Sequence, residues 1–200
     1  MYVVLGRPLA ALTNALNNWL GSMSGASAVI LGIILGLMMC FDLGGPINKA
    51  AYLFATTNLA VTNIGSLKVM AAVMAAGMVP PLAMALSTTL RPKLYQPAER
   101  ENGTAAWLLG ASFISEGAIP FAAADPLRVI PSMMAGGAIT GALSMALGAA
   151  SKAPHGGIFV FFAIDRAWAF VLAIVVGTLV AALLVTVLKA SARRKATASA

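Results

Sequence analysis

Three stretches of the sequence, residues 67–90, 127–150 and 167–189, are each long and apolar enough to cross a lipid bilayer as a helix. A span needs about 20 apolar residues, because an α-helix rises about 1.5 Å per residue and the hydrocarbon core is about 30 Å thick. Hydrophobic residues make up 60% of the chain and charged residues only 10%, too few to cover a soluble domain of this size. The sequence therefore predicts an all-α membrane protein.

Two further apolar stretches are too short or too interrupted to span. Residues 26–41 run into the break FDLGGPINKAA before a second short apolar run, and residues 104–124 are interrupted by the sequence SEGAIP. Unwound backbone at bilayer depth is tolerated only inside protein or beside a cavity. Paired interrupted segments of this kind mark the midplane substrate sites of transporters. We therefore predict transmembrane helices together with two re-entrant hairpin segments.

Two other segments carry expectations of their own. Residues 2–20 place leucines at helical spacing opposite asparagines, which predicts a one-sided helix at the membrane interface or against a neighbouring helix. Pro80 and Pro81 should bend the helix over residues 67–90, because each removes a backbone donor. A Gly32–Gly36 stripe predicts close helix packing in residues 26–41.

Basic residues gather in two places rather than on one face. Residues 91–103, which we expect to be a loop, carry Arg91, Lys93 and Arg100, and residues 191–200 form a basic tail. Under the positive-inside rule both regions are cytoplasmic, so an even number of crossings must separate them. The spans at 127–150 and 167–189 satisfy this count only if residues 104–124 turn back. The net charge of +7 lacks the aromatic interleaving of a nucleic-acid surface, so no nucleic-acid partner is expected.

Glu116 is the strongest single candidate for a functional residue. A carboxylate within an apolar segment costs at least about 2.5–3.5 kcal/mol on insertion scales, so it needs a partner or a task. Flanked by Ser115 and Gly117, it can accept hydrogen bonds from the hydroxyl groups of a small polar solute such as a sugar. The alternative is a carboxylate at the interface that only pairs with an arginine or lysine.

The break after residue 41 supplies the second group of candidate substrate-binding residues. Gly44 and Gly45 form a turn between Asp42 and the pair Asn48 and Lys49. Asparagine offers both donors and acceptors, which suits neighbouring sugar hydroxyls. Asp42 and Lys49 either bind the ligand or neutralise each other.

His155 is the chain's single histidine, and it precedes two glycines in the tight turn APHGGIF. We expect it to contact substrate or move a proton, with an ordinary surface residue as the alternative. Cys40, the single cysteine, lies in an apolar run and is expected to be a buried hydrophobe. No residues have metal-ligand spacing, so no metal or cofactor is expected.

Near residue 125 the pattern favours structure over function. Asp125 before Pro126 is typical of a helix N-cap followed by proline at the first helical position, with Arg128 at the interface. Asp165 and Arg166 are expected to be an exposed pair.

Four motifs together carry a family resemblance. The stretches GGPINKAAYLFA, AAGMVPPLAMAL, FISEGAIPFAAADPLRVIPS and KAPHGGIFVF resemble the fructose-specific membrane component (EIIC) of the bacterial phosphoenolpyruvate-dependent phosphotransferase system. The resemblance covers about residues 1–190, as a transport domain matching the C-terminal part of the family's membrane domain. Related sequences often have ITEGAIP, so Ser115 is a departure that keeps the hydroxyl.

The resemblance implies a permease that binds fructose and presents it to a phosphocysteine on an EIIB partner, with EIIA and HPr upstream. It implies a multi-pass protein of the bacterial inner membrane, in contact with lipid, with its C-terminus in the cytoplasm and with homodimers as an expected assembly. A glutamate in a re-entrant hairpin holds the sugar in such families, and Glu116 stands in that motif. His155 and the turn from Gly44 to Lys49 map onto family motifs, and Glu116 or His155 is the candidate proton acceptor.

Two alternatives stay open at this point. One is a secondary transporter or channel that moves an unmodified small polar solute, because such a protein needs the same interrupted helices and midplane polar groups. The other is an inactive, truncated EIIC fragment.

Overall fold

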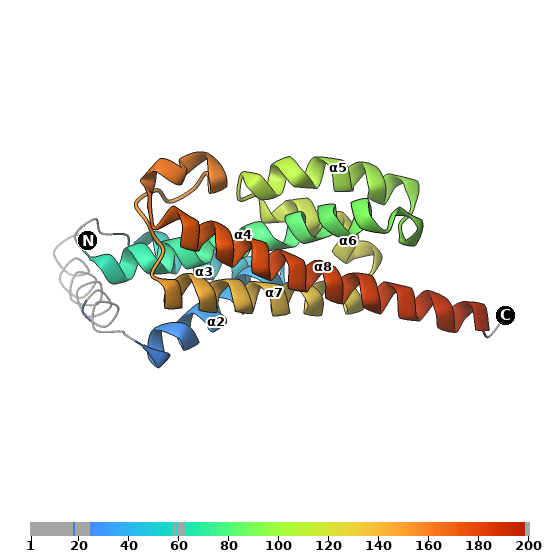
Figure 1. The fold of residues 1–200 in the computed structure, drawn as a ribbon, viewed down its shortest axis with the longest axis horizontal. Coiled ribbons are helices and arrows are strands. Elements are labelled where there is room, and N and C mark those ends of the chain that lie inside the picture. Colours follow the sequence, from blue (N-terminus) through green and yellow to red (C-terminus); the bar gives the residue numbers. More distant parts are fainter. Residues whose placement is uncertain (1–17, 19–24, 58, 60–62, 199–200) are drawn as a thin grey trace, which may run out of the picture.

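The computed structural model in Figure 1 describes residue 18 and residues 25–57, 59 and 63–198. The helix expected over residues 2–20 lies outside this part of the chain apart from Asn18. The described elements are α2 (Ala26–Phe41), α3 (Pro46–Thr57), α4 (Ile64–Leu90), η1 (Pro92–Leu94), α5 (Pro97–Ala111), η2 (Ser115–Ala118), α6 (Ile119–Ala124), α7 (Pro126–Leu147), β1 (Ala150–Ser151), η3 (Gly157–Ala163), β2 (Ile164–Asp165) and α8 (Ala167–Ala198).

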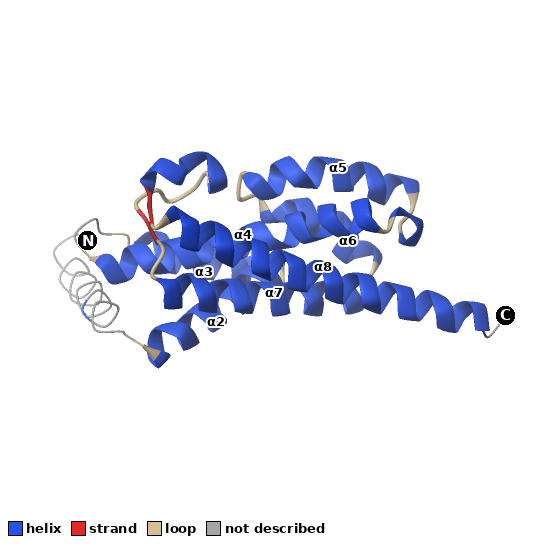
Figure 2. Cartoon of the chain, in the orientation of Figure 1, coloured by secondary structure: helices blue, strands red, loops and turns tan. Residues whose placement is uncertain are grey.

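Three of these helices, α4, α7 and α8, are long and apolar enough to cross a membrane. They lie side by side along the long axis of the molecule, with α4 and α8 running in one direction and α7 in the other (Figure 1). The spans predicted over residues 67–90 and 167–189 are therefore confirmed as helices, and the span predicted over residues 127–150 is helical as far as Leu147. The described chain is almost entirely helical, and its strands are the two-residue pair β1–β2 (Figure 2).

The helix α4 is the core of the molecule. It is apolar on all sides, as a helix surrounded by protein must be, and most of its residues are fully buried. Helices α2, α5, α7 and α8 pack around it. Pro80 and Pro81 lie inside α4, which continues through both as one element.

The interrupted segments form two helical hairpins that approach α4 from opposite ends. In the first, α2 runs inward to a turn at residues 42–45 and α3 runs back out (Figure 1). In the second, α5 runs inward to a turn at residues 112–115, and η2 and α6 return (Figure 1). The predicted turns in both segments are thus present, and their tips lie at the same level of α4.

The prediction of a loop over residues 91–103 is wrong for residues 97–103, which are helical. Only a short connection with η1 joins α4 to α5, which begins at Pro97. The Glu99 side chain accepts from the Gln96 backbone N–H while the Gln96 side chain accepts in return, a capping box that starts the helix. The polar stretch after Pro97 contains good helix formers, so its hydrophilicity reflects an exposed helix face rather than a loop.

The crossing of α2 and α7 is a backbone-to-backbone contact. A β-carbon on Gly32 would lie 2.3 Å from the Gly141 carbonyl oxygen, and one on Gly36 would lie 2.1 Å from that of Gly137. The predicted glycine stripe of α2 therefore meets a matching stripe on α7, as in closely packed membrane helices.

Substitution of Gly141 by valine should destabilise the protein severely, because its β-carbon would lie 2.0 Å from the Gly32 carbonyl oxygen. We expect the free energy of unfolding to fall by about 2 kcal/mol or more. Ala146→Val, on the exposed face of the same helix, is the matched control. Thermal unfolding in detergent can be followed by the reaction of a thiol dye with Cys40, which is buried in the folded state. Equal melting temperatures for the two variants would contradict the packing.

Candidate functional site

The tips of the two hairpins touch each other. A β-carbon on Gly44 would lie 2.6 Å from Oε1 of Glu116, so the absence of a side chain at Gly44 lets the glutamate approach the first tip. Gly44 also has φ of +105°, a conformation that favours glycine. The sequence motifs around residues 45 and 117 are therefore brought together in space.

The first tip is organised by Asp42. Its Oδ2 accepts from the Ile47 backbone N–H at 2.7 Å and its Oδ1 accepts from the Asn48 N–H at 2.9 Å, so the carboxylate caps the start of α3. Gly45 leaves room for this cap, because a β-carbon there would lie 2.6 Å from Oδ2. No ion pair joins Asp42 to Lys49 within the described residues. Asp42 shapes the turn instead.

Asn48 ties the two arms of the first hairpin together. Its Nδ2 donates to the Met39 carbonyl at 2.6 Å, near the last turn of α2. The side chain is buried, and this bond leaves its carbonyl oxygen as an acceptor beside the cavity described below.

The second tip is fastened to α4 by Ser115. Its Oγ donates to the Gly77 carbonyl at 2.9 Å, in a buried position. The neighbouring Glu116 is exposed and makes no hydrogen bond or ion pair with any described residue. Pairing with an arginine or lysine, the alternative weighed for Glu116, is therefore absent from the described part of the chain.

The PHGG turn closes over the second tip. Gly156 and Gly157 both have positive φ, and a β-carbon on Gly157 would lie 2.1 Å from the Ala111 carbonyl oxygen. This close approach sets the His155 ring 5.0 Å from the Phe113 ring, centroid to centroid, and 6.3 Å from that of Tyr52. The tight turn predicted around His155 is confirmed.

A cavity of about 160 Å³ lies where the two tips and this turn meet. It is lined by Asn48, Lys49, Tyr52, Phe113, Ser115, Glu116 and His155. Five of the predicted site residues line the cavity directly: Asn48, Lys49, Ser115, Glu116 and His155. Gly44 does not line it but contacts Glu116. Asp42 and Gly45 lie behind the turn and do not line it either. The lining combines a carboxylate, an amide, an ammonium group and an imidazole with two aromatic rings.

Tyr52 and Phe113 are the two lining residues that the sequence analysis missed. Both belong to the motifs that were singled out, AAYLFA and SFISEG, and aromatic rings can pack on the apolar face of a small ring-shaped ligand. No group of three or more His, Cys, Asp or Glu residues that could hold a metal ion occurs in the described chain.

The cavity lies at half the length of α4. Ser115 and Cys40 donate to the carbonyls of Gly77 and Ala76, respectively, and Gly77 is the central residue of Ile64–Leu90. Both hairpins thus penetrate to the middle of the bundle from their own ends.

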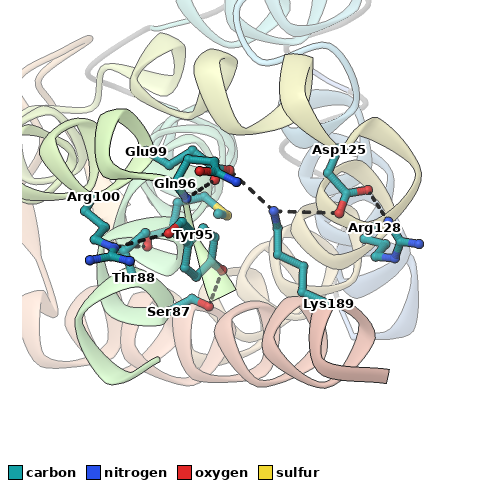
Figure 3. Close-up of polar contacts among 10 residues, drawn as sticks. Ser87, Thr88, Tyr95, Gln96, Glu99, Arg100, Asp125, Arg128 and Lys189 are labelled. Atoms are coloured by element: carbon teal, nitrogen blue, oxygen red, sulfur yellow. Dashed lines mark hydrogen bonds and ion pairs between the residues drawn. The ribbon is translucent and has the colours of Figure 1, made fainter. Parts of the chain in front are cut away.

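A second polar cluster holds the base of the hairpin that carries Glu116. Figure 3 shows Lys189 of α8 between Glu99, at the start of α5, and Asp125, at the end of α6. The Lys189 Nζ lies 3.4 Å from Glu99 Oε1 and 3.7 Å from Asp125 Oδ2, and its side chain is only 10% exposed. One largely buried cation therefore joins both ends of the hairpin to a membrane-spanning helix.

The Asp125 carboxylate forms ion pairs instead of the expected helix cap. It occupies the N-cap position of α7, with Pro126 following, but its side chain makes no cap hydrogen bond. Oδ1 instead accepts from Arg128 Nη1 at 2.9 Å while Oδ2 faces Lys189. The expected Asp165–Arg166 pair is also replaced, because Asp165 pairs with Lys152 and Arg166 donates to the Leu147 carbonyl.

Tyr95 completes this cluster from the connection between α4 and α5. Its hydroxyl lies 2.5 Å from Ser87 Oγ, and Lys189 Nζ lies 4.7 Å from the centre of its ring. Burial raises the pKa of Tyr95 to about 12; the hydrogen bond with Ser87 opposes this rise, and the carboxylates of Glu99 and Asp125 add to it. The phenol is therefore neutral at physiological pH.

Comparison with known proteins gives a consistent result. Residues 1–136 match the family profile described as "Phosphotransferase system, EIIC". The chain is 52% identical over 192 residues to the PTS system fructose-specific EIIB'BC component of Escherichia coli K12, which covers 94% of this chain and 34% of that protein. It is 48% identical to the fructose-specific EIIC component of Haloferax volcanii, covering 94% of this chain and 50% of the relative.

A third relative is shorter. The fructose permease IIC component of Bacillus amyloliquefaciens is 44% identical, over 98% of this chain and 63% of its own length. The chain thus spans about a third of the length of several of the curated relatives it matches. No solved structure matches it significantly.

Replacing Lys189 with methionine should leave Glu99 and Asp125 close together without their shared cation. Removal of one partner from a buried ion pair costs about 3–5 kcal/mol, so we expect a loss of about 3 kcal/mol of unfolding free energy. Lys152→Met, which breaks a pair whose side chains are 48% and 52% exposed, should change it by less than about 1 kcal/mol.

Adding Glu99→Gln to the Lys189→Met variant should restore part of the loss, because one of the two facing carboxylates becomes neutral. Thermal unfolding of the single and double variants in detergent measures both effects. Strictly additive losses would show that Lys189 and Glu99 do not interact.

Proposed function

The chain belongs to the family of phosphotransferase-system EIIC components, and we propose on that basis that its central cavity binds fructose and passes it across the membrane. The relatives described above are named as fructose-specific, which supports this choice of sugar. The single observation that carries the proposal is the unpaired carboxylate of Glu116 at the meeting point of two helical hairpins, halfway along α4.

The depth of the cavity supports a substrate site at the centre of the bilayer. Exposed apolar side chains follow α8 from Trp168 to Leu188, which at about 1.5 Å per residue is about 30 Å, the thickness of the hydrocarbon core. Gly177 lies near the middle of this stretch. Gly136 of α7 connects this level of α8 to α4, because a β-carbon there would lie 2.5 Å from the Gly177 carbonyl oxygen and 3.1 Å from Val79. Val79 is two residues from Gly77, whose carbonyl accepts from Ser115, so the middle of α8 and the cavity lie at similar depth.

At that depth the two hairpins are re-entrant segments in the proposed arrangement. Each enters from one side, breaks at its tip and returns to the same side. Irregular backbone at the midplane then lies beside a cavity and against α4, the only setting in which a bilayer tolerates it. Interrupted helices of this kind surround the substrate in many transporters.

The proposed sugar contacts follow from the lining chemistry. Glu116 accepts hydrogen bonds from sugar hydroxyls, and a charged acceptor makes these bonds about twice as strong as neutral ones. Asn48 offers an amide acceptor and Lys49 an ammonium donor from the opposite tip. Tyr52 and Phe113 pack against the carbon skeleton of the sugar.

We propose phosphorylation of the bound sugar by a partner EIIB, as the compound names of several relatives suggest. A fructose hydroxyl oxygen attacks the phosphorus of an EIIB phosphocysteine, the S–P bond breaks as the O–P bond forms, and the hydroxyl proton passes to Glu116 or His155. The thiolate of EIIB is the leaving group. Cys40 does not serve as this thiol, because it is buried and donates to the Ala76 carbonyl at 3.4 Å.

The proposed orientation in the inner membrane puts the basic end of the bundle in the cytoplasm. Arg193 of α8 donates to the Lys93 carbonyl, and Lys189 pairs with Glu99, so the C-terminal part of α8 lies beside the connection from α4 to α5. Two spans, α7 and α8, separate these regions, in agreement with the even number required. By the positive-inside rule this shared basic end faces the cytoplasm.

Glu116→Gln should abolish or severely weaken fructose binding while the fold is kept. Loss of a charged hydrogen-bond acceptor corresponds to about 1.5–3 kcal/mol, or a tenfold to hundredfold loss of affinity. Glu101→Gln, a matched change at an exposed glutamate of α5, should leave binding unchanged. Fructose affinity in membranes that contain the chain measures both variants, and undiminished binding by Glu116→Gln would contradict the assignment.

A second measurement separates group translocation from plain transport. Membranes supplied with phosphoenolpyruvate and the soluble phosphotransferase proteins, including EIIB, should form fructose phosphate with the native chain and not with Glu116→Gln. Accumulation of unmodified fructose under the same conditions would instead indicate a secondary transporter.

A further inference from the structure

The connection between β1 and β2, residues 152–163, forms a closed loop at the end of the bundle opposite to the basic end. At its base the two strands pair with each other, and the Lys152 backbone N–H donates to the Ala163 carbonyl at 3.0 Å. From there the chain runs to the PHGG turn at the second hairpin tip, and η3 leads back to β2 (Figure 1, orange). The base of the loop is therefore fixed, and its far point lies at the sugar cavity.

The β1–β2 connection lies within the membrane-spanning part of the bundle. A hollow of about 570 Å³ separates η3 from α8, with Ile158 and Phe161 on one side and α8 residues between Ala167 and Val175 on the other. These α8 residues include the first part of the exposed apolar stretch that begins at Trp168. In the proposed orientation, η3 thus lies in the outer half of the bilayer, and the connection is a third re-entrant segment.

The surroundings of η3 leave it room to shift. Its side chains Phe159, Phe161 and Phe162 are exposed, and every residue that lines the hollow between η3 and α8 is apolar. No backbone hydrogen bond of the described residues joins the PHGG turn to the second hairpin. Movement of η3 toward α8 therefore brings no buried polar side chain into contact with lipid.

The sugar cavity lies on the outer side of both hairpin tips. Six of its seven lining residues belong to the hairpins, and His155 is the exception. Asn48, Lys49 and Tyr52 follow one another on a single face of α3, which leads from the first tip toward the outer end of the bundle. The β1–β2 connection therefore lies between the cavity and a solute that arrives from outside.

His155 closes this side of the cavity by packing alone. Its ring lies 5.0 Å from that of Phe113 on the second tip and 6.3 Å from that of Tyr52 on α3, centroid to centroid. It makes no hydrogen bond or ion pair with any described residue, and its side chain is exposed. One ring thus bridges the two hairpins through aromatic contacts, which open and re-form without breaking a hydrogen bond.

From this arrangement we propose that the β1–β2 connection is the outer gate of the sugar cavity, with His155 as the residue that closes it. When the gate opens, His155 leaves Phe113 and Tyr52 and η3 shifts into the hollow beside α8, while the β1–β2 ladder holds the base in place. The inference rests on the fructose site and the membrane orientation proposed above. It adds the route by which the sugar enters.

The variant His155→Cys tests the position of the gate without any sugar. A membrane-impermeant thiol reagent should label it from the outer face of sealed membrane vesicles and not from the inner face. The native chain gives the background, because its single cysteine, Cys40, is buried. Absence of labelling from the outer face would overturn the proposal, as would equal labelling from the two faces.

The rates of fructose binding and release test the closing contact. His155→Ala removes both aromatic contacts and should speed release about tenfold. Association should become faster as well, because a gate hinders entry and exit alike, whereas a lost sugar contact speeds release alone. His155→Phe keeps a ring in this place and should bring both rates within about twofold of the native values. Lys152→Met, in the exposed pair at the base of the loop, is the control and should leave them unchanged.

Two kinetic results would contradict the gate. Unchanged rates in His155→Ala would show that the ring does not close the cavity. Equally fast release from His155→Ala and His155→Phe, with native association, would make His155 a hydrogen-bonding partner of the sugar instead.

The two experiments also separate this inference from the fructose assignment. If the native chain binds no fructose, the proposed function fails, whereas labelling of His155→Cys from the outer face still supports the gate. If fructose binds and outer labelling is absent, the gate alone fails.

Discussion

The contact of both hairpin tips with the middle of α4 is the constraint on which the rest of the structure depends. Two chain reversals lie at the depth of the bundle centre, and their polar groups must find partners within protein. Ser115 and Cys40 meet this need by donating to consecutive α4 carbonyls, those of Gly77 and Ala76. A β-carbon on Gly77 would lie 2.2 Å from the Phe113 ring, so the tips reach α4 only because this residue is glycine.

Much of this arrangement could be predicted from the sequence, because the signals involved are local and strong. Apolar length identified the three long helices, and glycine with proline marked both turns. Glu116, Asn48 and His155 stood out as polar residues in apolar surroundings, and the structure brings them to one cavity. Asp42 was placed correctly in the turn, but its carboxylate caps α3, which depends on a backbone geometry that spacing alone does not specify.

Contacts between distant parts of the chain could not be predicted in the same way. Lys189 lies at the end of an apolar helix and resembles an ordinary interfacial lysine, yet it joins Glu99 and Asp125, 90 and 64 residues away in the sequence. The start of α5 was missed because a charged, exposed helix face and a polar loop have similar composition. The wrong start of α5 and the unforeseen contacts of Lys189 both concern the base of the second hairpin, where charged groups stabilise packing rather than bind a ligand.

Each of the two tips has one strained residue, and this explains how the cavity keeps its shape. Leu43 and Phe113 both have positive φ, at +51° and +66°, a conformation that costs a bulky residue about 1–3 kcal/mol. Both side chains are buried, and burial of such a side chain contributes about 1.5–3 kcal/mol, which offsets the strain. Packing therefore fixes the backbone at each tip. Glu116 lies three residues after Phe113, whose ring cannot move without losing its burial. The uncompensated carboxylate of Glu116 can therefore remain facing the cavity.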